Sequence, residues 1–263
     1  MLRLSRRDNL FDSLAPGYEG VGEYYDLFAD DSDIQFFLRM AREYGSPVLD
    51  LASGSGRVAF PLAEAGFEVV ALEKSQSMLN AARRRLNSSP RKIQNRLTIV
   101  EGDMRSFDLG TEFALVIVPN SFGHALSTDS QISTLECVRR HLAQDGVFVL
   151  DLFPGALQHE HASFEDGPVP LPDGRTVSRK GAMHMDPVRQ LLRVDLTYTV
   201  RTSTGATSEM TVVTSGAAVI FNREADLLVR IAGFETANEY GDLDGGAYLP
   251  TSSRRILVLK KKQ

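Results

Sequence analysis

Short apolar runs alternate with amphipathic segments over residues 46–153. The apolar runs are rich in Val, Ile and Leu and are bounded by turn residues, which is typical of buried strands. The segments between them repeat their apolar positions at helical spacing. The predicted strands are 47–51, 68–72, 97–101, 114–118 and 147–152, and the predicted helices are 57–65, 76–86 and 130–142. Strands that alternate with helices in this way predict a parallel sheet with right-handed crossovers.

The flanking segments predict further elements. Residues 22–44 have one apolar face and are predicted to form a helix that packs on the sheet or covers the site. After residue 153, a connection rich in Pro and Gly leads into alternating apolar and polar segments, which predict antiparallel strands. The strand–helix pattern then returns. The expected elements are loop 154–174, strands 175–185, 190–201 and 210–220, helix 222–232, and strands 234–240 and 254–259.

These elements predict an α/β fold, a doubly wound, mostly parallel seven-stranded sheet with an inserted antiparallel β-unit. The expected organisation is a helical lid over 1–45, a cofactor-binding core over 46–153, an insertion over 154–220 that caps the substrate, and a return to the core over 221–263. A chain of this length can bury one such core and its insertion.

Composition and charge exclude several classes of protein. Acidic residues outnumber basic ones by 34 to 29, and the basic residues are scattered except at the chain ends, which argues against a nucleic-acid partner. The single cysteine, Cys137, excludes an intramolecular disulfide, and the five histidines lack the spacing of a metal motif, so we expect no metal site. No apolar stretch reaches the roughly 18 residues of a membrane span, and no signal peptide is expected. We expect a cytoplasmic protein; its oligomeric state stays open, and a homodimer is compatible with the sequence.

A strand that ends in Asp50 runs into a glycine-rich turn, Gly54-Ser-Gly56, which opens a helix. Glycines let the backbone approach a ligand closely and leave helix N-terminal amides pointing at it. The same residues also satisfy the dinucleotide fingerprint G-x-G-x-x-A. Glu73, at the end of the next strand, can accept hydrogen bonds from ribose hydroxyls in either class of cofactor. Both classes therefore remain open at this point.

Asp50 and Asp103 bear on the choice. A carboxylate beside the turn repels a pyrophosphate and attracts the ammonium and sulfonium groups of S-adenosylmethionine. The structural alternative for Asp50 is a carboxylate that accepts hydrogen bonds from loop amides. Asp103 follows the third strand and can accept a hydrogen bond from an adenine amino group, or cap an Asx turn. Together with Glu73, these acids follow three successive strands, at the edge where open α/β sheets bind ligands.

Over residues 47–152 the chain resembles the class I S-adenosylmethionine-dependent methyltransferases, which have a Rossmann-like sheet. The family motif D/E-x-G-x-G-x-G is matched at Asp50, Gly54 and Gly56, whereas Ala52 replaces the first glycine. The resemblance implies that S-adenosylmethionine is the cofactor. It further implies that Asp50 orients the methionine part and Glu73 holds the ribose. The cofactor-binding residues that it implies are Tyr25, Asp50, Ala52, Ser53, Gly54, Gly56, Glu73, Lys74, Met78, Gly102, Asp103, Met104, Pro119 and Asn120.

The loop after the fourth strand, residues 118–124, should face the transferred methyl group. It does not match the D/N-P-P-Y/F loop of DNA amine methyltransferases, which disfavours a nucleic-acid substrate. His124 is the expected general base, and its alternative is a histidine that caps the next helix or makes a structural hydrogen bond. Tyr24 is the second expected catalytic residue, and its alternative is a packing role. The residues expected to line the acceptor pocket are Phe122 of this loop and, from other segments, Phe153, His184, Tyr198 and Tyr240.

The function expected from these residues is methyl transfer from S-adenosylmethionine to an amine or hydroxyl of a small molecule. The chain looks most like the amine, sugar and glycopeptide methyltransferases of bacterial natural-product pathways. Two alternatives stay open: an NAD(P)-dependent oxidoreductase that uses the same glycine-rich turn, and a regulatory module that binds the cofactor without turnover.

Overall fold

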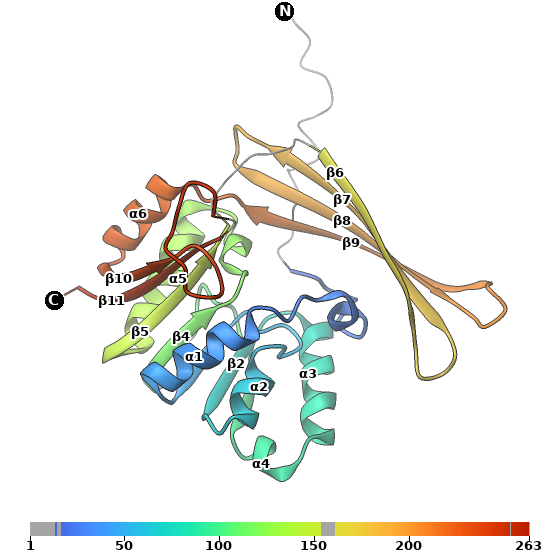
Figure 1. The fold of residues 1–263 in the computed structure, drawn as a ribbon, viewed down its shortest axis with the longest axis horizontal. Helices are drawn as coiled ribbons and strands as arrows, with labels where there is room; N and C mark the ends of the chain where they lie inside the picture. Colours follow the sequence, from blue (N-terminus) through green and yellow to red (C-terminus); the bar gives the residue numbers. More distant parts are fainter. Residues whose placement is uncertain (1–13, 15–16, 154–160, 253, 263) are drawn as a thin grey trace, which may run out of the picture.

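The computed structural model describes residues 14, 17–153, 161–252 and 254–262, and Figure 1 shows two sheets. The larger sheet has seven strands in the order β10-β11-β5-β4-β1-β2-β3. These strands are β1 (Val48–Leu51), β2 (Val69–Glu73), β3 (Leu97–Glu101), β4 (Phe113–Val118), β5 (Leu142–Leu152), β10 (Phe234–Tyr240) and β11 (Arg255–Lys261). β1 to β5 pair in parallel, and β11 pairs antiparallel with both β5 and β10.

Helices cover both faces of this sheet. Its described helices are η2 (Tyr25–Phe28), α1 (Ile34–Tyr44), α2 (Ala59–Glu64), α3 (Gln76–Ser88), α4 (Arg91–Gln94), η3 (Phe122–His124), α5 (Thr128–His141) and α6 (Asn222–Ile231). One apolar core contains α1, α2 and the strand side chains on their face, and a second contains α5, α6 and those on the opposite face. Because both faces are covered, β4 is a continuous apolar run, and β1 is buried at all four positions although it contains Asp50.

The second sheet lies between β5 and α6 in the chain and has four antiparallel strands in the order β6-β7-β8-β9. These strands are β6 (His161–Pro170), β7 (Thr176–Asp186), β8 (Leu191–Arg201) and β9 (Thr207–Ala218). The sheet leans away from the seven-stranded core in Figure 1, and the end of β9 contacts η3. Val21 and Tyr24 pack into an apolar cluster with β7, β8 and β9, so the segment before α1 covers one face of this sheet.

The predicted fold class is confirmed, and two of the predicted elements are wrong. Residues 22–44 form two separate helices, because Ser32 gives its amide and hydroxyl hydrogens to Asp30 and thereby interrupts the helical backbone pattern. The connection 154–174 contains strand β6, although residues 154–160 lie outside the described residues. A register shift between Asp166 and Val169, around Gly167, breaks the alternation that would have revealed this strand.

No helix in the described part of the chain has the length and apolar character needed to span a membrane.

Candidate active site

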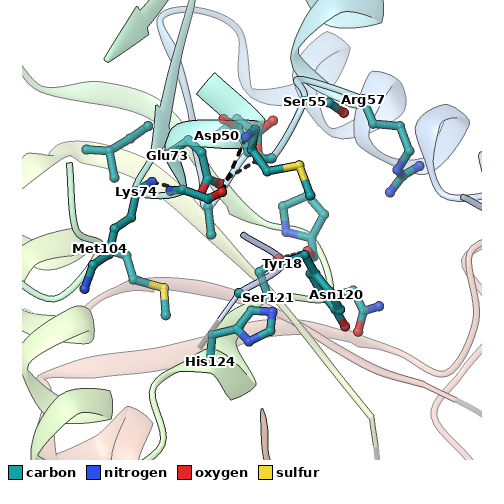
Figure 2. A pocket seen from close by; sticks show the side chains of 18 of the residues that line it. Tyr18, Asp50, Ser55, Arg57, Glu73, Lys74, Met104, Asn120, Ser121 and His124 are labelled. Carbon is teal, nitrogen blue, oxygen red and sulfur yellow. Dashed lines mark hydrogen bonds between the residues drawn. The ribbon is translucent and has the colours of Figure 1, made fainter. Parts of the chain in front are cut away.

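A cavity of about 360 Å³ opens beyond the carboxyl ends of β1, β2 and β4. From β1 the sheet continues to β2 and β3 on one side and to β4 and β5 on the other, so the strand order reverses at β1. Open α/β sheets usually bind their ligands beyond the carboxyl ends of the strands at such a point. In the view of Figure 2, Asp50, Glu73 and Lys74 lie on one side, His124 lies on the other, and Tyr18 lies between. Of the predicted site residues, those that line the cavity are Tyr25, Asp50, Ala52, Ser53, Gly54, Glu73, Lys74, Met78, Gly102, Asp103, Met104, Pro119, Asn120 and His124.

Asp50 is a buried carboxylate that faces the cavity and is 1% exposed. Neither of its oxygens has a hydrogen-bond partner among the described residues. Burial raises the pKa of Asp50 to about 8, against a smaller opposite effect of the Arg57 guanidinium. The structural alternative, a carboxylate that accepts hydrogen bonds from loop amides, is therefore not what the geometry shows. The side chain has an unused capacity for a cation.

The loop-bonding carboxylate is instead Glu73, at the end of β2. Its Oε2 accepts a hydrogen bond from the Gly54 amide at 2.8 Å, and its Oε1 accepts from the amides of Lys74 at 2.9 Å and Ser75 at 2.7 Å. Glu73 thus ties the glycine-rich turn to the start of α3. The remaining lone pairs of this carboxylate can face a ligand, because the side chain also lines the cavity.

The glycine-rich turn uses left-handed backbone at three positions, with φ of 51° at Ala52, 60° at Gly54 and 85° at Gly56. Ala52 stands where the family motif has its first glycine. Its left-handed backbone costs a non-glycine residue about 1–2 kcal/mol. Gly56 does not line the cavity. A Cβ there would come within 2.8 Å of the Phe60 ring, so Gly56 serves the packing of α2.

Asp103, the residue predicted to accept the adenine amino group, is already saturated with donors. Arg105 donates to its two oxygens from the backbone amide, Nε and Nη2, and Lys74 Nζ donates to Oδ2 at 2.9 Å. Hydrogen bonds from Arg105 hold the pKa of Asp103 well below its usual range. A direct contact to adenine would require one of these donors to move. Asp103 therefore orients Lys74 and Arg105 along the cavity wall.

His124 lies at the end of η3, buried against the end of β9. Its Nδ1 is 3.1 Å from the carbonyl oxygen of Gly216, which can only accept, so Nδ1 carries the proton and Nε2 is left with a lone pair. Burial lowers the pKa of His124, so the ring is neutral at pH 7. His124 does not cap the next helix, because Ser127 caps α5 by accepting from the Ser130 amide. The structural hydrogen bond that the sequence left open is present, between Nδ1 and the Gly216 carbonyl.

The segment before α1 contributes residues that the sequence pattern did not single out. Tyr18 lines the cavity, meets the His124 ring edge-on at 5.7 Å and lies 5.2 Å from the Tyr25 ring. Glu19 accepts hydrogen bonds from the Ser75 hydroxyl at 2.6 Å and the Ser77 amide at 3.0 Å, which fixes this segment to the start of α3. No periodic pattern marks residues 17–21, so their position follows from the tertiary structure. Further cavity residues missed by the sequence analysis are Gly17, Ser55, Arg57, Val58, Leu72, Ser75, Arg105 and Ser121.

The prediction that Tyr24 faces the site is wrong. Its ring packs against Tyr198, with centroids 6.4 Å apart, and its hydroxyl donates to Glu209 at 3.2 Å. Tyr198 belongs to the same apolar cluster and also does not line the cavity. Helical geometry turns Tyr24 toward the second sheet, whereas its neighbour Tyr25 points into the cavity.

Three other residues predicted for the acceptor pocket lie elsewhere. His184 is on β7, with its Nδ1 2.9 Å from Nδ1 of His161. Tyr240 packs on Phe36 of α1. Phe153 is 56% exposed. None of the three lines the cavity, and Phe122 is a core residue. Within the described residues, no group of three or more metal-ligating side chains comes together.

The cavity fits S-adenosylmethionine by the chemistry of its walls. Asp50 offers two buried oxygens without partners to a cation, which matches an ammonium or a sulfonium group. Glu73 Oε2 accepts one hydrogen bond, from the Gly54 amide, and keeps one lone pair for a ribose hydroxyl. Met78 and Met104 supply apolar, polarisable walls of the kind that contact an adenine ring. These individual contacts remain predictions.

Comparisons with known proteins agree with this geometry. Residues 48–146 match the family described as a methyltransferase domain. The cypemycin N-terminal methyltransferase of Streptomyces sp is 29% identical over 83% of this chain and 84% of that relative. The dTDP-3-amino-3,4,6-trideoxy-alpha-D-glucopyranose N,N-dimethyltransferase of Streptomyces venezuelae is 31% identical over 60% of this chain and 64% of that relative. The solved structure of the CcbJ methyltransferase from Streptomyces caelestis superimposes with a TM-score of 0.76, at 25% identity, over 92% of this chain and 96% of that one. The methyltransferase prediction is confirmed, and the dinucleotide alternative finds no support.

Replacing Asp50 by Asn should stabilise the ligand-free protein at alkaline pH. The ordinary pKa of an aspartate, as in the unfolded chain, is 3.8, whereas the pKa of Asp50 in the folded chain is about 8. At pH values between these two, the folded chain keeps a proton that the unfolded chain has lost. The free energy of unfolding therefore falls as pH rises from 4 to 8. Urea unfolding from pH 5 to pH 9 should show an advantage of Asp50→Asn that grows with pH. The exposed Asp145→Asn is the control. An advantage independent of pH would contradict this account.

The same variant should bind S-adenosylmethionine more weakly by roughly 10- to 100-fold, the loss expected for one hydrogen bond to a charged group. Its affinity for S-adenosylhomocysteine should fall less, because the sulfur of that product is neutral. Titration calorimetry with both ligands measures the difference, and Glu68→Gln, a change at an exposed position, is the control. Equal losses for the two ligands would leave Asp50 a purely structural role.

Proposed function

Because the chain is a class I S-adenosylmethionine-dependent methyltransferase, we propose that it methylates an amine nitrogen of a small molecule. The observation that carries this proposal is the half-buried imidazole of His124, whose Nε2 is free to accept a proton within the same cavity that holds the Asp50 carboxylate, which has no hydrogen-bond partner among the described residues. One side of the cavity thus suits a cationic donor and the other side suits a group that must lose a proton.

The strength of the base favours an amine over a hydroxyl. An alkyl ammonium has a pKa of about 10, as lysine does, so a neutral imidazole can remove its proton at a modest energetic cost. A hydroxyl resembles water, with a pKa of about 16, and an imidazole of lowered pKa is too weak to ionise it. Two relatives support the same class of acceptor, since their names describe N-terminal methylation of cypemycin and N,N-dimethylation of an amino sugar.

S-adenosylmethionine supplies an activated methyl group on its sulfonium. The residues of this chain bind the donor, orient the acceptor and exclude water from the cavity. Asp50 compensates the positive charge of the donor, and the rings of Tyr18 and Tyr25 wall the cavity between the donor side and His124. His124 takes the proton of the acceptor at Nε2 while Gly216 holds its Nδ1–H. Catalysis by positioning is sufficient for such a displacement, so a second acid–base residue is not required.

We further propose that the acceptor is a small molecule and not a nucleic acid. The formal net charge is -5, which would repel a polyanion, and the wall after β4 reads Pro119-Asn120-Ser121 without the D/N-P-P-Y/F signature.

The proposal is tested with paired acceptors that differ at the reacting atom. Suitable pairs are an amino sugar and its parent sugar, and glycine and glycolate. We expect methyl transfer from S-adenosylmethionine to at least one amine and to no hydroxyl partner, because only the ammonium matches the basicity of His124. Mass spectrometry of the products measures this. Methylation of the hydroxyl partners in preference to the amines would overturn the proposal.

His124→Ala should lower kcat by about 100-fold or more and leave the affinity for S-adenosylhomocysteine nearly unchanged. Because burial lowers the pKa of His124, the wild-type rate should fall only below about pH 6.5, where the imidazole gains a proton. This acidic limb should vanish in the variant. The exposed His161→Ala, on β6, is the control. A smaller loss with the limb retained would mean that His124 positions the acceptor without taking its proton.

A further inference from the structure

Asp151 is a buried carboxylate on the acceptor side of the cavity that the proposed reaction does not use directly. It is the penultimate residue of β5 and is 3% exposed. β5 lies beside β4 in parallel register, with Val118 opposite Leu150, so Asp151 comes next to the loop that follows β4. This loop contains Asn120 and leads to His124.

One oxygen of Asp151 joins two distant parts of the chain. Its Oδ2 accepts a hydrogen bond from the Asn120 amide at 3.2 Å and another from Arg254 Nη1 at 2.6 Å. Arg254 precedes β11 and is itself largely buried, with 16% of its side chain exposed.

The loop needs such an anchor because its backbone is held in an unfavourable conformation. Asn120 has a φ of 46°, in the left-handed region, and both Pro119 and Asn120 line the cavity. Ser121 closes the turn locally by donating from its hydroxyl to the Pro119 carbonyl at 2.8 Å. The amide of Asn120 donates to Asp151, and this contact restrains the backbone that leads into η3 and His124.

We propose that Asp151 is a positioning residue for methyl transfer, which holds the acceptor-side loop through the Asn120 amide while Arg254 holds the carboxylate in its charged form. This inference rests on the proposed function, since it assumes that the acceptor meets the loop. Asp151 itself touches neither cofactor nor acceptor.

The charges around Asp151 support this role. The groups that face it are Arg254 from the segment before β11, Asp33 from the segment before α1, and the Asn120 amide. Asp33 is itself paired with Arg57, at 2.5 and 2.6 Å. Burial raises the pKa of Asp151 to about 6, and Arg254 opposes this rise. The carboxylate is therefore charged at pH 7 and takes up a proton as pH falls through 6, which weakens its pairing with Arg254.

The test needs no acceptor in its first part. In the protein saturated with S-adenosylhomocysteine, the NMR resonance of the Asn120 amide should shift with pH, with a midpoint near 6. The shift should be absent in Asp151→Asn and retained in His124→Ala, which separates the two titrating groups. Asp145→Asn, on the same strand but exposed, should behave as wild type. An Asn120 resonance that does not titrate in wild type, or that titrates unchanged in Asp151→Asn, overturns the proposal.

The second part uses the best amine from the paired-acceptor assay. Asp151→Asn should lower kcat by roughly 10- to 100-fold, the loss that a displaced reacting group causes, with the affinity for S-adenosylhomocysteine within about twofold of wild type. If that variant does not fold, Arg254→Gln and Arg254→Lys replace it: the Gln variant should lose kcat, and the Lys variant should restore part of it. A kcat equal to that of wild type in Asp151→Asn, or in both Arg254 variants where these replace it, overturns the proposal. A loss of cofactor affinity instead of kcat also overturns it. If no amine is methylated, the proposed function fails while the amide titration still decides the role of Asp151.

Discussion

A carboxylate buried without a partner is the constraint on which the site depends. Asp50 lies on β1, the strand at which the order of the sheet reverses, and β2 and β4 pair with both of its edges. The described side chains of the sheet therefore give the carboxylate no hydrogen-bond partner, and Asp50 faces the cavity instead. A cation that enters the cavity can pair with this carboxylate. Burying Asp50 without a partner lowers the stability of the ligand-free fold and raises its affinity for a positively charged donor. The glycine-rich turn follows from the same need, because it leaves space above Asp50.

The segment of residues 17–28 links the two sheets to this cavity. Tyr24 and Val21 attach it to the antiparallel sheet, Glu19 attaches it to the start of α3, and Tyr18 and Tyr25 face the cavity. The inserted sheet thus reaches the site through this segment and through the Gly216 carbonyl of β9, which contacts His124. It does so without placing its own large side chains, such as that of Tyr198, in the cavity wall. A change in the packing of the antiparallel sheet against Val21 and Tyr24 would therefore also move Tyr18 and Tyr25 in the cavity.

The acceptor side is held by partners from the C-terminal half of the chain. Gly216, at the end of β9, fixes the tautomer of His124, and Asp151, at the end of β5, fixes the backbone of Asn120. Neither contact is local, because the residues are separated by 92 and 31 positions. The loop after β4 is short and carries polar residues, and these two hydrogen bonds give it a single orientation. Catalysis that depends on positioning requires this rigidity.

The sequence by itself determined the parallel core, the inserted antiparallel unit and the donor side of the cavity. Those features depend on local order: the period of apolar residues marks strands and helices, and Asp50, Gly54 and Glu73 lie within or directly after strands whose ends must meet at one edge. Strand β6 was not predicted, because its register shift at Gly167 breaks the alternation of apolar and polar residues that marks a strand. Tertiary structure alone decided the acceptor side. Tyr18 reaches the cavity from an aperiodic segment, and Tyr24 turns away from it by one helical step. The state of Asp50, Asp103, His124 and Asp151 depends on burial and on partners far away in the chain, because the free energy of a charge is set by what surrounds it in space.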